Sequence, residues 1–237
     1  PNLSAGSARL LCEMYEQLVF QTPSFKVSES LERDLAELFK RNGIKHILEV
    51  GPAPHGGLVS RISHIALEAG AKVHAIDLLP PAKCIPEELD YRVSDVKNLE
   101  SVFPGQKFDI IIAHGVFEPG GNRFESIEEA DILNKIRKTH AAVRVLLRSM
   151  SENPRGFIVL SGHTSKVPLR RDWVEKSAKV VKWERRVLDI TDASYEHIAE
   201  SLKDSPYLRE RYLGRAIEQF ASVLVIKKKL RKLPTSK

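Results

Sequence analysis

Short apolar runs separated by helix-like segments are the feature that most restricts the fold of this 237-residue chain. Three of them, His46–Val50, Phe108–Ala113 and Gly156–Ser161, are predicted to be buried strands. Their apolar residues mostly follow one another instead of alternating with polar ones, which is typical of parallel sheets covered by helices on both faces. The alternation of strands and helices therefore predicts an α/β fold with a mostly parallel sheet.

Four further segments complete a predicted sheet of seven strands: Lys72–Asp77, Tyr91–Ser94, Val180–Ile190 and Phe220–Lys228. Apolar residues at helical spacing predict helices over residues 7–21, Ser28–Asn42, Leu58–Ala69, Ile127–Met150 and Tyr195–Leu202. The first two helices form a predicted N-terminal extension, residues 1–43, which belongs to the same domain and is a candidate lid over a substrate. Residues 44–228 form the predicted main domain, and residues 229–237 a basic C-terminal tail.

The net charge of +6 arises at the C-terminus of the chain. Residues 227–237 include six Lys or Arg and no Asp or Glu, whereas the remaining residues carry 31 of each sign. A balanced body argues against a nucleic-acid surface spread over the whole domain. The tail could contact RNA or an anionic surface, or it could be a solvated terminus. A second basic stretch, residues 170–186, could line an anionic acceptor site or form a solvated helix face.

Two cysteines, Cys12 and Cys84, are too few for a disulfide framework or a Cys-rich zinc site, so a reducing, cytoplasmic setting is expected. No stretch approaches the ~18 consecutive apolar residues of a membrane span. No metal is predicted, because no His-x-x-x-His motif or carboxylate cluster occurs. Asp109, inside the fourth predicted strand, is expected to point to a strand edge.

Ligands of parallel α/β sheets bind beyond the carboxyl ends of the strands, so the residues that follow each strand are the candidate site. A turn of small residues, Gly51–Leu58, follows the first strand and would let the backbone approach a ligand closely. Asp77 ends the second strand, where a carboxylate can accept both hydroxyl protons of a ribose. Asp95 follows the third strand. It could bind an adenine amino group while Val96 packs on the ring, or it could cap the next helix.

These positions together resemble the class I (Rossmann-like) S-adenosylmethionine-dependent methyltransferases. That family has an acidic residue and a glycine-rich turn around the end of its first strand. An acidic residue ends its second strand, an Asp follows the third, and the fourth begins Phe-Asp before apolar residues. The matching residues here are Glu49, Gly51, Asp77, Asp95 and 108–112. The resemblance covers roughly residues 44–162 and implies a Rossmann-like methyltransferase fold with S-adenosyl-L-methionine as cofactor.

The resemblance implies a set of cofactor-binding residues: Glu49, Gly51, Pro52, Ala53, Asp77, Leu78, Asp95, Val96 and His114. Gly51, Pro52 and Ala53 would lie against the cofactor. Ala53 departs from the family pattern, because a second glycine is usual there, and this leaves the path of the turn around the methionine end open.

The resemblance also implies separate roles for the other members of this set. Asp77 would hold the ribose and Asp95 the adenine. His114 would lie near the adenine or the sulfonium. Glu49 would organise the glycine turn rather than touch the ligand.

Methyl transfer by this family proceeds by in-line attack of an acceptor on the sulfonium methyl group. The protein mainly binds and orients the two reactants, and in some members it supplies a base. Candidate bases are His55, His114, Glu118 and His163, although any single His could instead be a surface or capping residue. His163 follows the fifth strand on the expected acceptor side and is the leading candidate, with Glu118 second.

The acceptor is predicted to be an oxygen or nitrogen atom of a small molecule. The family's Asp/Asn-Pro-Pro-Tyr/Phe motif for amino groups of bases or glutamine is absent, since residues 117–119 read Phe-Glu-Pro. One alternative is a non-catalytic methyltransferase-like subunit that binds RNA or a protein partner. Another is an NAD(P)-dependent oxidoreductase, because Asp77 would also suit an NAD ribose, although the chain has no Tyr-x-x-x-Lys pair.

Overall fold

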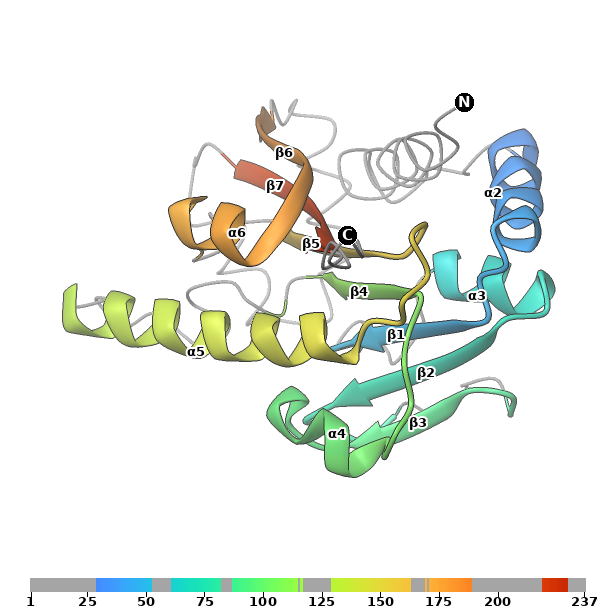
Figure 1. The fold of residues 1–237 in the computed structure, drawn as a ribbon, viewed down its shortest axis with the longest axis horizontal. Coiled ribbons are helices and arrows are strands. Elements are labelled where there is room, and N and C mark those ends of the chain that lie inside the picture. Colours follow the sequence, from blue (N-terminus) through green and yellow to red (C-terminus); the bar gives the residue numbers. More distant parts are fainter. Residues whose placement is uncertain are drawn as a thin grey trace, which may run out of the picture.

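The computed structural model describes residues 29–52, 61–81, 87–114, 116, 129–162, 169, 171–188 and 219–229. These described residues form one seven-stranded sheet in the order β3-β2-β1-β4-β5-β7-β6 (Figure 1). The strands are β1 (His46–Val50), β2 (Lys72–Asp77), β3 (Asp90–Val93), β4 (Ile110–His114), β5 (Phe157–Gly162), β6 (Ala178–Leu188) and β7 (Gln219–Lys228). Only β7 runs antiparallel to its neighbours, β5 and β6. The predicted seven-stranded, mostly parallel sheet is confirmed.

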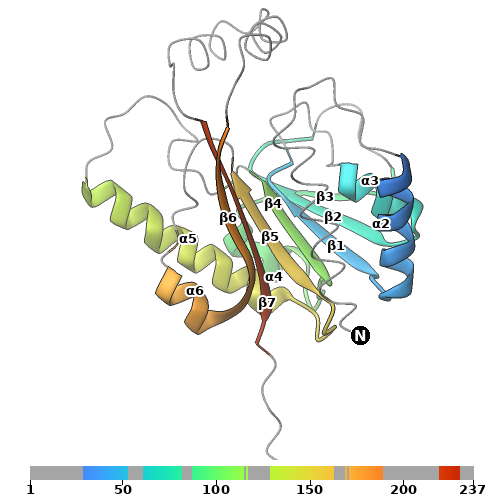
Figure 2. The same cartoon turned by 90° about the horizontal axis from the view of Figure 1, so that it is seen from above.

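Helices cover both faces of this sheet (Figure 2). On one side lie α2 (Glu29–Arg41) and α3 (Arg61–Glu68). On the other lie α4 (Leu99–Val102), α5 (Glu129–Ser149) and α6 (Arg171–Ser177), and a short 3-10 helix, η1 (Val96–Asn98), precedes α4. None of the helices among the described residues is both long enough and apolar enough to cross a membrane.

The unbroken apolar runs occur because successive strand residues face opposite sides of the sheet. In β4, Ile110 and Ile112 pack into the core under α2 and α3, together with Phe39. Ile111, between them, packs into the second core under α4, α5 and α6, together with Leu146. Every position of such a strand is buried, so a polar side chain has no solvated face to occupy.

Strand boundaries agree with the sequence prediction most closely in the first two strands of the chain. β1 and β2 begin and end at the predicted residues. β4 begins at Ile110, two residues later than predicted, and Phe108 forms only an isolated bridge with Met150. The predicted helices over residues 7–21 and 195–202 lie outside the described residues.

The expectation that the side chain of Asp109 points to a strand edge is wrong. Asp109 is buried and lies just before β4, at the amino ends of the parallel strands. Its Oδ2 accepts hydrogen bonds from the backbone N–H groups of Lys45 (2.7 Å) and His46 (3.1 Å). Its Oδ1 accepts a bond of 2.5 Å from the Ser151 hydroxyl. One carboxylate therefore ties the entry to β1 to the loop that leads into β5.

We predict that Asp109→Ala lowers the free energy of unfolding by about 3 kcal/mol, because it leaves two backbone N–H groups without their acceptor. Asp109→Asn should fall between the wild type and the alanine variant, since its amide oxygen can still accept from the backbone. Urea unfolding measures both, with Glu100→Ala on exposed α4 as the control. A loss for Asp109→Ala no larger than that of Glu100→Ala would contradict this role.

Two histidines contact each other at the same end of the sheet. Nδ1 of His46 lies 3.3 Å from Nε2 of His74, and Nδ1 of His74 lies 3.4 Å from Oδ2 of Asp90. The His74 ring meets Phe103 and Phe108 edge-on, at centroid distances of 5.3 and 5.4 Å. Burial lowers the pKa of both imidazoles, more than the nearby carboxylates can offset.

We predict an acid-dependent loss of stability from this pair. The folded imidazoles bind protons less readily than unfolded ones, so the free energy of unfolding should fall as the pH drops through about 6.5. The urea midpoint should be lower at about pH 5.5 than at about pH 7.5. His74→Gln should reduce that difference, whereas His64→Gln, on α3, should leave it unchanged. An equal pH dependence in all three proteins would count against the pair.

Candidate functional site

The carboxyl ends of β1, β2 and β3 lie side by side and form the candidate site (Figure 1). The backbone N–H of Gly51, directly after β1, donates to the carbonyl of Ile76 in β2 at 2.8 Å. The backbone N–H of Ser94, directly after β3, donates to the carbonyl of Asp77 at 2.7 Å. The structure thus brings the glycine turn and the acidic strand end together, as the sequence predicts.

Gly51 occupies a position that accepts no other residue without strain. Its φ is +70°, in the left-handed region that L side chains rarely adopt. A Cβ added there would lie 2.4 Å from Cγ2 of Val116, which follows β4. The backbone after β1 therefore passes directly against the segment after β4. Pro52 is buried next to it, and Ala53 lies outside the described residues.

Glu49 is a buried carboxylate between the apolar residues Leu48 and Val50 of β1. Its Oε2 accepts a hydrogen bond of 2.7 Å from the hydroxyl of Ser63, in the first turn of α3. This bond joins β1 to the helix that follows the glycine turn, so it fixes both ends of the turn. The geometry is what a loop-organising role requires, and that role stays a prediction. Sequence analysis missed Ser63, since nothing in the helical pattern marks which serine faces inward.

Asp77 is buried at the end of β2, and the two residues after it are exposed apolar side chains. Its Oδ1 accepts from the backbone N–H of Leu79 at 2.9 Å, which forms a tight turn. Leu78 and Leu79 are 70% and 50% exposed. The edge therefore offers a carboxylate next to apolar surface, the pair of features that a ribose with an attached aromatic base would need.

Tyr91 of β3 also contacts this turn, and the sequence analysis did not identify it as a site residue. Its hydroxyl donates a 2.8 Å hydrogen bond to the carbonyl of Leu79. Burial, followed by the negative charge of Asp77, raises the pKa of Tyr91 to about 12. The phenol therefore stays protonated and keeps donating at any physiological pH. Its place in β3, opposite Ala75 of β2, is the only signal that could have identified it.

Asp95 adopts the capping role that the sequence left as an alternative. Its Oδ1 accepts from the backbone N–H of Lys97 at 2.9 Å and caps η1, and its Oδ2 lies 3.3 Å from Nζ of Lys97. Val96 packs against the core under α4 and α5. Both side chains are thus already engaged, and their predicted contacts with adenine stay predictions.

The side chains of the predicted catalytic residues lie outside what the structure describes. Glu118, His163 and His55 lie outside the described residues. The backbone of His114 ends β4 and pairs with Ser161 of β5, but its side chain lies outside what the structure describes. The roles of all four therefore stay predictions.

Comparison with known proteins identifies the fold. No family model and no curated protein matches the sequence. Among solved structures, that of the [4+2]-cyclase SpnF aligns with a TM-score of 0.52 and 13% identity, over 97% of this chain and 98% of that chain. Identity this low shows a shared fold alone. The strand order and this alignment support the Rossmann-like fold class predicted from the sequence.

Two solved methyltransferase structures align over most of the chain at lower scores. The 1,6-didemethyltoxoflavin-N1-methyltransferase of Burkholderia thailandensis gives a TM-score of 0.42 and 14% identity over 95% of this chain and 90% of that one. The plantazolicin methyltransferase BpumL gives 0.42 and 14% over 96% and 83%. Both were solved with S-adenosylhomocysteine. Scores this low carry no conclusion about this chain.

We predict that Gly51→Ala lowers the free energy of unfolding by about 2 kcal/mol, from left-handed strain and from the clash with Val116. Gly43→Ala is the matched control. Its φ is +61° and no atom lies within 4 Å of the added Cβ, so it carries the strain without the clash.

Val116→Ala removes the clashing Cγ2. The further loss of stability caused by Gly51→Ala should therefore be smaller in the Val116→Ala background than in the wild type. Thermal and urea unfolding measure all four variants. Equal costs for Gly51→Ala and Gly43→Ala would show that the contact with Val116 does not constrain the turn.

Proposed function

We propose that this protein is an S-adenosyl-L-methionine-dependent methyltransferase that transfers a methyl group to an oxygen or nitrogen atom of a small-molecule acceptor. The observation that carries the proposal is that Gly51 lies next to Asp77. The backbone N–H of Gly51 donates to the carbonyl of Ile76, the residue directly before Asp77. A glycine backbone beside a strand-end carboxylate, at the carboxyl edge of a parallel sheet, is the arrangement that binds adenosyl cofactors through their ribose.

The chemistry of the described residues fits an adenosyl group. The Asp77 carboxylate can accept from both ribose hydroxyls while its Oδ1 also holds the turn through Leu79 N–H. Leu78, exposed beside it, offers apolar surface to an aromatic base. Gly51, without a Cβ, lets the segment after β4 lie directly against the turn, which brings a second strand end close to Asp77.

When bound, the cofactor supplies the electrophilic methyl group on its sulfonium. The residues of this chain have the remaining tasks, which are to orient the pair of reactants and to exclude water. A proton must also leave the acceptor atom when that atom is a hydroxyl or an ammonium nitrogen. We assign this step to His163 after β5, with Glu118 after β4 as the second candidate, because both follow strands at the same edge.

The fold by itself does not determine the reaction. The solved structure that aligns best among those compared above is described as a [4+2]-cyclase, which shows that one fold can carry different chemistry. Binding of the cofactor must therefore be tested before any acceptor is screened. The same experiment tests the two alternatives that the sequence left open, which are the NAD(P)-dependent oxidoreductase and the non-catalytic subunit.

We predict micromolar binding of S-adenosylmethionine and S-adenosylhomocysteine, and at least a tenfold loss in Asp77→Asn, or about 1.4 kcal/mol. Asn keeps an oxygen for Leu79 N–H but cannot accept from both ribose hydroxyls. Isothermal titration calorimetry measures the affinities, and Glu100→Gln on exposed α4 is the control for loss of one negative charge.

Binding of NAD instead of the adenosyl ligands would replace the proposal with the oxidoreductase. If none of these ligands binds to the folded protein, the non-catalytic subunit is favoured. If the wild type and Asp77→Asn bind the adenosyl ligands equally well, the ribose contact assigned to Asp77 is wrong.

A further inference from the structure

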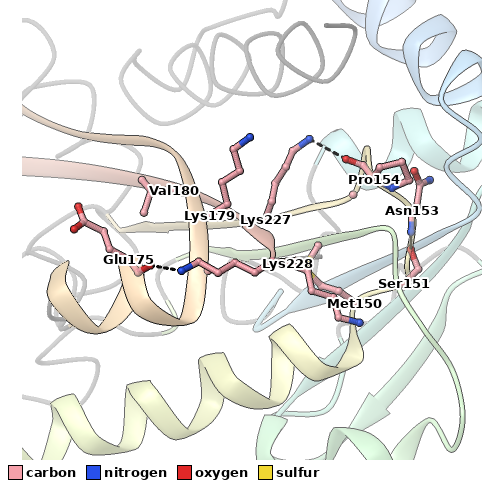
Figure 3. Close-up of a pocket in the computed structure, with 12 residues that line it drawn as sticks. Met150, Ser151, Asn153, Pro154, Glu175, Lys179, Val180, Lys227 and Lys228 are labelled. Carbon is pink, nitrogen blue, oxygen red and sulfur yellow. Dashed lines mark hydrogen bonds between the residues drawn. The ribbon is translucent and has the colours of Figure 1, made fainter. Parts of the chain in front are cut away.

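A cavity of about 690 Å³ lies among β6, β7 and the loop before β5 (Figure 3). The end of β7 and the start of β6 form one of its walls, and the loop before β5 forms another. Ile158 of β5 pairs with Ile226 of β7, which places Lys227 and Lys228 at the amino ends of the parallel strands. The cavity is therefore separate from the proposed cofactor site.

Two lysines of this cavity face each other across the antiparallel ladder. Lys179 of β6 is the register partner of Lys227 of β7. Their side chains extend to the same side of the sheet, next to each other (Figure 3). Like charges that are directly opposite on neighbouring strands repel each other and destabilise the sheet. Lys179 is exposed and Lys227 is half-buried, so an anion held between them would reduce this repulsion.

Glu175 also lines the cavity and has a contact of its own, and the described residues give the lysine pair no carboxylate partner. Among them, no carboxylate forms an ion pair with Lys179 or Lys227, and Lys227 donates only to the carbonyl of Pro154, at 3.2 Å. Burial, followed by the charge of Lys179, lowers the pKa of the Lys227 ammonium. The positive charge of Lys179 therefore acts on Lys227, and the described residues bring no carboxylate to the pair that would offset it.

The two neighbouring lysines each have a structural partner, as Lys227 has in the carbonyl of Pro154. Lys228 forms an ion pair with Glu152. Lys229 donates to the carbonyls of Glu175 and Lys176 at 2.7 and 3.0 Å, at the carboxyl end of α6. Lys228 thus holds the end of β7 against the loop before β5, and Lys229 holds it against α6, so the strand that carries Lys227 is held in place.

We propose that the Lys179–Lys227 pair binds a phosphoryl group. A phosphate dianion has enough oxygens to accept from both ammonium groups at once and removes their repulsion. The cavity has room for more than a single phosphate. Lys228 and Lys229 line the same cavity, so further phosphates would also be attracted. The source is either a free polyphosphorylated molecule or a nucleic-acid strand.

The test uses inorganic triphosphate as the probe, with the full chain and isothermal titration calorimetry. Lys179→Gln and Lys227→Gln should each lower its affinity at least tenfold. Lys138→Gln, on the exposed surface of α5, is the matched control and should change it less than twofold. Without triphosphate and at low salt, Lys179→Gln should raise the melting temperature, because it removes the repulsion. An undiminished melting temperature also shows that the variant folds.

A second arm, with a single-stranded RNA oligonucleotide measured by fluorescence anisotropy, identifies the source. RNA affinity that falls tenfold in Lys179→Gln points to a nucleic-acid strand. RNA affinity that does not change, while triphosphate affinity falls, points to a free phosphorylated molecule.

The proposal is overturned if triphosphate does not bind, or if Lys138→Gln weakens it as much as Lys179→Gln does. S-adenosylhomocysteine affinity should be unchanged in Lys179→Gln, so this result is independent of the outcome for the proposed function.

Discussion

The burial of both faces of the central strands is the constraint on which the rest of the structure depends. Ile47 and Leu48 of β1 are fully buried, and they belong to different cores on opposite sides of the sheet. A polar side chain inside such a strand loses its hydration on either face and must find a partner within the protein. Glu49 meets this condition through Ser63. His74, inside β2, likewise lies beside His46 and Asp90. Polar groups without such contacts are expected where strands begin or end, and this places the chemistry at the two edges of the sheet.

The two edges use their polar groups in different ways. At the amino edge, the carboxylate of Asp109 accepts three hydrogen bonds from its own protein, so it serves as a structural link. At the carboxyl edge, Gly51 removes a side chain from the path of the backbone, and exposed Leu78 follows Asp77 directly. The exposed apolar surface at the carboxyl edge can receive a ligand, whereas the hydrogen bonds of Asp109 close the amino edge around β1 and β4. The lysine pair lies farther along the amino edge, where β6 and β7 line a cavity.

The sequence predicts the parts of this molecule that local patterns encode. β1 and β2 agree to the residue, because each is an apolar run that ends at a marked position, Gly51 or Asp77. The start of β4 was wrong by two residues, since the bonds of Asp109 to Lys45 and His46 are tertiary contacts that no local pattern contains. Tyr91 and Val116 were missed for the same reason. The Lys179–Lys227 pairing depends on the register of two strands far apart in the chain, which composition alone could not supply.

The positions of the two proposed sites limit how they can influence each other. β5 begins with Phe157 near Lys227 and ends at Gly162, directly before the proposed base His163. Six residues of strand span about 20 Å, which is roughly twice the Debye length at physiological salt, so a charge bound at one end is largely screened at the other. Coupling of the two sites through a conformational change would require β5 to shift against buried neighbours on both faces. Close-packed cores resist such shifts. The two sites should therefore bind their ligands independently, and a phosphorylated ligand at the lysine pair would act by placing a molecule on the protein rather than by changing its affinity for the cofactor.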